Sequence, residues 1–129
     1  MKFAPARLLL AIAALIQGGG GVIHALAFAK AEIVLDNTSA PAFYVNSFKA
    51  LWFGDSATLI AVSLILVCII ARPALASRWV VGLLALFPLC TALLVYNFVG
   101  SFLPAHTLLF AAILMLLAAY FYPIQPTAE

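Results

Sequence analysis

Asp55 is the one formal charge inside the long apolar segments of the chain, and it is the side chain there most able to do chemistry. It lies six residues after Lys49, at the start of an apolar run that ends at Arg72. An ionisable group buried at membrane depth costs about 2.5–3.5 kcal/mol near the centre of a helix, and it usually has a partner or a function. The other polar residues in the apolar segments are therefore judged by whether they could reach Asp55.

Four further polar side chains fall at the same predicted depth as Asp55: His24, Tyr96, Asn97 and His106. They lie close to the same end of three other apolar segments, with Tyr96 and Asn97 in one segment and His106 opening another, when depth is counted in residues along a helix. Four segments thus contribute polar groups to one depth band near the outer leaflet. This convergence predicts a single polar cluster.

The cluster has two main interpretations. In the first, His24, Asn97 or Tyr96 only satisfies Asp55, and the network fixes the register of the helices. In the second, aromatic side chains wall a pocket in which a few polar groups orient a small amphipathic ligand of the lipid or quinone class. The predicted walls are Phe28, Trp52, Phe53, Tyr96 and Phe98, and the predicted ligand-binding residues are His24, Trp52, Asp55, Tyr96, Asn97 and His106.

A metal site is a third interpretation, because two histidines and a carboxylate are ligands for zinc, iron or copper. The set would be His24, Asp55 and His106, and the two histidines could also face one another across a b-type haem. The three residues have no local ligand spacing such as H-x-x-x-H, and the sequence requires no cofactor. No nucleophile elbow, phosphate-binding loop or paired intramembrane carboxylates is present, so a role without catalysis is expected.

The composition places the protein in a lipid bilayer. The chain is 67% hydrophobic and 8% charged, against about 25% charged in ordinary soluble domains. A soluble domain of 129 residues could not bury so much apolar surface. The few basic residues stand at segment ends and form no patch, which argues against a nucleic-acid partner.

Four segments are long enough to cross a bilayer, which takes about 20 residues. Twenty-two uncharged residues separate Arg7 from Lys30, and the uncharged stretch from Trp79 to Ala128 divides at Gly100–Pro104 because Gly and Pro mark turns. We expect an all-α, four-helix transmembrane bundle formed by one domain, residues 1–129. The predicted helices are about 5–29, 48–71, 79–99 and 105–122, with an outer loop at 30–47 and a kink at Pro88.

The first segment contains four consecutive glycines, Gly18–Gly21. Small residues spaced four apart let membrane helices approach closely, and Ala14/Gly18 and Gly21/Ala25 have this spacing. We therefore predict a packing seam that includes Gly18, Gly21 and Ala25. The start of the chain also resembles a secretory signal ending at Ala27–Ala29, but its apolar run is longer than a signal core, so we expect a retained helix.

Lysines and arginines give the orientation, since they favour the cytoplasmic side. Lys2, Arg7, Arg72 and Arg78 fall on one side, against Lys30 and Lys49 on the other. We expect the protein to lie in the inner membrane of a bacterium. Both termini are predicted to be cytoplasmic, and the loop 30–47 is predicted to face the periplasm.

The layout resembles the small four-helix bacterial membrane proteins described as DoxX-like. The resemblance rests on the basic start at Arg7, the glycines Gly18–Gly21 and His24 near the end of the first helix, followed by a long first loop and tight later turns. It implies a quinone-adjacent function or an accessory role in a membrane redox system, and it assigns no functional residue.

The leading prediction is a membrane protein that binds a small hydrophobic or amphipathic molecule without catalysis. The alternative is an accessory or structural subunit of a larger membrane complex, such as a respiratory or redox complex. The partners considered are the lipid bilayer, a lipid or quinone, and a larger complex or further copies of the chain. A metal or redox membrane enzyme is the weaker third prediction.

Overall fold

The structure is a computed structural model that describes residues 4–122, and the regular elements in that range are all helices. They are α1 (Ala4–Asp36), α2 (Ala42–Ala71), the 3-10 turn η1 (Pro73–Leu75), α3 (Arg78–Leu84), α4 (Leu86–Phe98) and α5 (Leu103–Phe121). The structure has four helices long and apolar enough to cross a membrane, with α3 and α4 together forming the third, Arg78–Phe98. The protein is therefore a multi-pass membrane protein with an all-helical fold.

The first two helices are longer than predicted. α1 continues to Asp36 and α2 begins at Ala42, so most of the predicted 30–47 loop is helical and only residues 37–41 connect the two. No Gly or Pro interrupts residues 30–36, which leaves α1 free to continue. An ion pair between Lys49 Nζ and Glu32 Oε1, at 3.1 Å, joins the two extended ends.

The third span is broken at Ala85, where α3 ends and α4 begins. Proline has no backbone N–H, so Pro88 cannot donate to the carbonyl of Leu84 four residues earlier. The kink predicted at Pro88 is thus present one turn before the proline itself.

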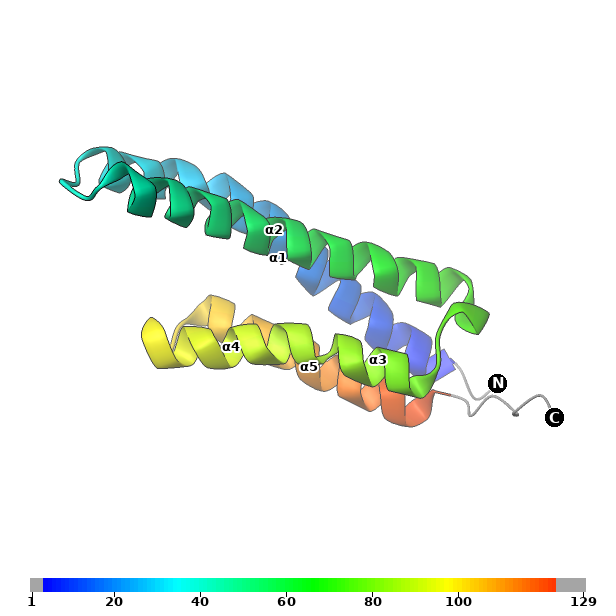
Figure 1. Cartoon of the computed structure of the whole chain (residues 1–129). Coiled ribbons are helices and arrows are strands. Elements are labelled where there is room, and N and C mark those ends of the chain that lie inside the picture. The colour runs from blue at the N-terminus through cyan, green and yellow to red at the C-terminus, as the bar shows by residue number, and fades with distance from the viewer. Residues whose placement is uncertain (1–3, 123–129) are drawn as a thin grey trace.

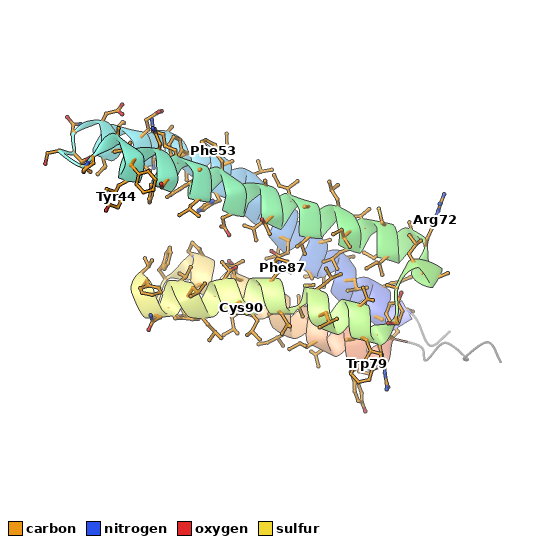
Figure 2. The ribbon with its side chains drawn as sticks, in the orientation of Figure 1. Tyr44, Phe53, Arg72, Trp79, Phe87 and Cys90 are labelled. Carbon is orange, nitrogen blue, oxygen red and sulfur yellow. The ribbon has the colours of Figure 1, made fainter. Side chains whose placement is uncertain are left out.

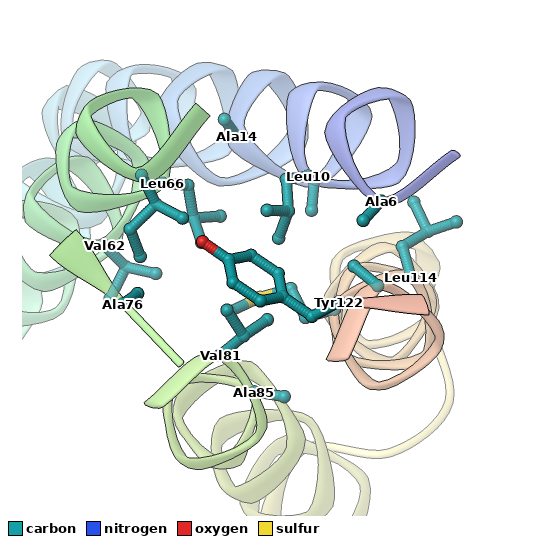
Figure 3. Close-up of a cluster of buried hydrophobic side chains, with 14 residues drawn as sticks. Ala6, Leu10, Ala14, Val62, Leu66, Ala76, Val81, Ala85, Leu114 and Tyr122 are labelled. Carbon is teal, nitrogen blue, oxygen red and sulfur yellow. The ribbon is translucent and has the colours of Figure 1, made fainter. Parts of the chain in front are cut away.

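The helices meet at one end of the molecule and diverge at the other (Figure 1). α1 packs against α2 and α5, and α5 also packs against α3 and α4, whereas α2 and α4 share no substantial interface within residues 4–122. The core lies at the closed end and is drawn in Figure 3. It comprises Ala6, Leu10, Ala13, Ala14, Val62, Leu66, Ile69, Ala76, Val81, Ala85, Leu114, Met115, Ala118 and Tyr122.

Tyr120, Phe121 and Tyr122 follow one another at the end of the last apolar segment, a pattern that predicts an aromatic belt at the membrane interface, but Tyr122 closes this core instead. Tyr120 is 81% exposed, but Tyr122 is only 3% exposed, and its hydroxyl donates to the carbonyl of Pro73 at 2.8 Å. Burial raises the pKa of Tyr122, and the charge of Arg7 opposes this rise. The phenol therefore stays protonated as a donor that fixes η1 to the end of α5.

The glycine segment brings α1 directly against α2. A methyl group at Gly21 would lie 2.9 Å from the backbone carbonyl of Ser56, and one at Gly18 would lie 2.7 Å from Ser63 Oγ. Ser63 Oγ in turn donates to the carbonyl of Ala14 at 2.7 Å. By contrast, no atom of a neighbouring element lies within 4 Å of a methyl group at Gly19 or Gly20.

Gly21→Ala is expected to lower the free energy of unfolding by about 1–3 kcal/mol, because the added methyl must push two backbones apart. Gly20→Ala is the matched control, since its methyl meets open space, and it should leave stability unchanged or raise it by up to about 1 kcal/mol. Denaturant titration of both variants in the same detergent micelles measures the difference. Equal stabilities would contradict a close contact at Gly21.

Candidate functional site

His24 on α1 is the centre of a polar cluster between α1 and α2. Its Nδ1 lies 2.9 Å from Ser56 Oγ and 3.8 Å from Asp55 Oδ2. The imidazole stacks on Trp52, with ring centroids 4.3 Å apart and planes 11° from parallel. Trp52 Nε1 also donates to the backbone carbonyl of His24 at 2.7 Å. The ring is thus held on one face and at one nitrogen.

The sequence positions these groups through helical spacing. Trp52, Asp55 and Ser56 are three and four residues apart, which places them on neighbouring parts of one helix surface. His24 follows Gly21 by one turn, and a Cβ atom at Gly21 would lie only 2.9 Å from the backbone oxygen of Ser56 on α2. The close approach made by the glycine therefore brings His24 within hydrogen-bond distance of α2.

The hydrogen bonds define the roles of the imidazole nitrogens. Ser56 has a single hydroxyl hydrogen, and it is directed to the carbonyl of Trp52 at 3.1 Å. Ser56 Oγ is then the acceptor and His24 Nδ1 the donor, which leaves Nε2 as the acceptor in the neutral ring. Within residues 4–122, no hydrogen bond is made by Nε2, and the His24 side chain is 32% exposed.

A second, separate cluster joins α4 to α5. The hydroxyl of Tyr96 bonds His106 Nδ1, and Ser101 Oγ lies 3.3 Å from His106 Nε2. Both ring nitrogens of His106 thus have partners from the short connection between the two helices or from the end of α4. These bonds are exposed and fasten the α4–α5 turn.

The prediction of one polar cluster is therefore wrong. The structure brings His24, Trp52 and Asp55 together, brings Tyr96 and His106 together elsewhere, and leaves Asn97 exposed. The physical reason is the divergence of α2 from α4 at this end (Figure 1). Residue counting gives depth along each helix but not the lateral distance between helices.

The predicted aromatic pocket is present only in part. Phe28 is buried and contacts Phe53 and Trp52, with ring centroids at 4.7 and 5.9 Å. Phe98 is 79% exposed and cannot serve as a wall. Two shallow surface hollows, one on α4 and one beside Trp79, are lined by other residues. The site around His24 is open on one side.

The described residues contain no group of three or more His, Cys, Asp or Glu side chains that could hold a metal ion. His24 and Asp55 are near one another, but His106 belongs to the other cluster. The same separation removes the facing histidine pair considered for haem.

Ser56 was not among the predicted site residues but belongs to the site, because it holds His24. Gln17 is a further polar residue on the same face of α1 as His24. Gln17 is 1% exposed, and neither of its amide atoms has a hydrogen-bond partner within residues 4–122. It precedes Gly21 and His24 by four and seven residues, the spacing of one helix face, and that spacing could have indicated it.

Ser56→Ala is expected to lower the free energy of unfolding by about 1 kcal/mol, because it leaves His24 Nδ1 without its partner. The matched control is Thr58→Ala. Thr58 also bonds a carbonyl of its own helix, that of Gly54 at 2.8 Å, but it is exposed and touches no residue of the cluster. The control should change stability by less than about 0.5 kcal/mol. Thermal unfolding in detergent compares them, and equal losses would contradict the role of Ser56.

Comparisons of the chain with protein-family models, with curated proteins and with solved structures found no match. The fold and the His24 cluster therefore rest on the sequence and the geometry described above.

Proposed function

We propose that the protein binds a small amphipathic molecule of the lipid or quinone class, without catalysis, at the His24 cluster. The polar head of the ligand meets His24 and Asp55, and its apolar body lies between the diverging helix pairs α1–α2 and α4–α5. The other predicted ligand contacts, Tyr96, Asn97 and His106, lie at the end of α4 or the start of α5 and are not part of this site.

The observation that carries the proposal is the free Nε2 of a rigidly held imidazole. The ring is fixed by Trp52 and Ser56, so a ligand need not order it, and this lowers the entropic cost of binding. In the neutral ring Nε2 accepts a hydrogen bond from a hydroxyl group, and in the protonated ring it donates one to a carbonyl. Quinols and quinones, or lipid glycerol and ester groups, offer these partners.

Gln17 supports a ligand or water deeper in the same region. A buried amide without partners is rare, and it usually marks a bound polar group. Gln17 lies two turns below His24 on the same face of α1, so the polar atoms extend from the half-exposed imidazole towards the core.

The membrane and its orientation complete the proposal. The distribution of Lys and Arg supports a bacterial inner membrane with both termini in the cytoplasm, which puts the His24 cluster nearer the periplasmic face. The DoxX-like layout of Arg7, Gly18–Gly21 and His24 is in keeping with a quinone-adjacent role.

Native mass spectrometry of the protein released from its own membranes in a mild detergent tests the function. The wild-type protein should carry extra mass from one small amphipathic molecule. His24→Phe keeps an aromatic ring against Trp52 but removes both ring nitrogens, and it should lose most of this mass. His106→Phe is the matched control, because it removes the same atoms from the other cluster, and it should keep the mass.

Loss of the mass in both histidine variants, or a bare wild-type protein, would contradict the proposal. Thermal unfolding of each variant establishes that the comparison is made between folded proteins.

The alternative is an accessory subunit, and the extended α1–α2 hairpin favours it. α1 has 33 residues and α2 has 30, against about 20 for one crossing, and their joined ends project beyond the α4–α5 turn (Figure 1). Phe43 and Ile33 near the tip are 74% and 66% exposed. Apolar side chains exposed together mark a surface for another protein.

This alternative predicts that Phe43→Ser reduces the fraction of protein found in a larger assembly on native gels of solubilised membranes. Phe98→Ser is the matched control, since Phe98 is 79% exposed at the end of α4 away from the hairpin tip, and it should leave the assembly unchanged. A monomer in every case would exclude the accessory role.

A further inference from the structure

A shallow hollow of about 340 Å³ lies at the opposite end of the molecule from the His24 cluster, between α3 and α5. It is lined by Arg78, Trp79, Gly82 and Ala119. Arg78 is the first residue of α3, and Gly82 lies one helical turn further along. The hollow therefore begins at the end of a membrane span and continues towards its middle.

The charged rim of the hollow is a single guanidinium. The Arg78 guanidinium carbon lies 5.0 Å from the centroid of the Trp79 ring, close enough for a cation–π contact. Within residues 4–122 the carboxylates are Glu32, Asp36 and Asp55. All three lie towards the end of the molecule where the helix pairs diverge, so none of them neutralises the charge of Arg78. This end of the described structure thus presents positive charge at the membrane surface.

The floor of the hollow is formed by two small apolar residues, Gly82 and Ala119. A methyl group at Gly82 would meet only the Cβ of Ala119, at 4.0 Å. Two small residues facing one another between helices leave a groove, and Trp79, 71% exposed, forms its wall. Tryptophan is enriched at the level of lipid headgroups. We therefore expect the rim of the hollow, formed by Arg78 and Trp79, to lie at that level.

We propose that this hollow binds one anionic phospholipid. The phosphate lies on the guanidinium of Arg78, which can donate two parallel N–H bonds to it. An acyl chain lies over Gly82 and Ala119 beside the Trp79 ring. Basic hollows between membrane helices at the headgroup level have the chemistry for such lipids. A zwitterionic lipid carries its own cation and gains less from Arg78.

The test is native mass spectrometry of the full chain after reconstitution in vesicles of equal parts phosphatidylglycerol and phosphatidylethanolamine. The wild-type protein should retain phosphatidylglycerol in preference to phosphatidylethanolamine. Arg78→Gln should lower that preference about fivefold, which corresponds to the roughly 1 kcal/mol that one basic residue contributes at an anionic surface. Arg72→Gln, which removes a charge from the same surface but not from the hollow, should lower the preference by much less.

Arg72 is the matched control because it is an exposed arginine at the same end of the molecule but does not line the hollow. Figure 2 shows it at the end of α2, on the opposite side of the molecule from Trp79. Equal effects of the two arginine variants, or equal retention of the two lipids by the wild-type protein, would overturn the proposal.

Gly82→Leu tests the apolar half of the hollow separately. A leucine side chain fills the groove over Ala119 and should reduce the amount of retained phosphatidylglycerol while Arg78 is intact. Gly20→Leu is its control, because Gly20 meets no neighbouring element within 4 Å and lies outside the hollow. Unchanged retention in folded Gly82→Leu would overturn the placement of the acyl chain.

Discussion

Close approach of helix backbones through small side chains is the constraint on which the rest of this structure depends. Lipid chains are as apolar as leucine, so helices in a bilayer gain little from burying leucine against leucine and must gain from packing. Gly18 and Gly21 provide this on the α2 side of α1. On α5, Ala105, Ala111, Ala112 and Ala118 are buried. Among residues 4–122, α2 and α4 share no substantial interface.

That separation determines what the polar residues can do. A compact bundle would have brought Asp55 and His24 towards Tyr96 and His106 and allowed all four to satisfy one another. Instead His106 has both ring nitrogens partnered within its own helix pair, while His24 keeps one nitrogen free. At the end where the helix pairs diverge, the histidine nitrogen without a hydrogen bond among the described residues therefore lies on the α1–α2 pair.

The sequence was sufficient to predict the number and class of the helices, the kink at Pro88 and the glycine contact, because these follow from local composition and spacing. It did not show that α1 and α2 continue beyond the apolar segments, because residues 30–36 suit a loop or a helix, and contacts between the two helices, such as the Lys49–Glu32 ion pair, are seen only in the structure. It grouped Asn97 and His106 with Asp55, because depth along a helix says nothing about lateral distance. Tyr122 was misjudged for a related reason: an aromatic at a helix end can face the core or the lipid, and only packing distinguishes the two.

The position of α5 also bears on how the protein is made. α5 packs against α1, α3 and α4, yet it leaves the ribosome after all three of them. Until then α1 and α2 can pair with one another, but the third span, formed by α3 and α4, lacks α5, against which it makes its main contacts. Tyr122, whose hydroxyl fixes η1 to the end of α5, comes later still. We therefore expect a stage before α5 emerges in which the α1–α2 pair is already formed while the third span still lacks its main partner.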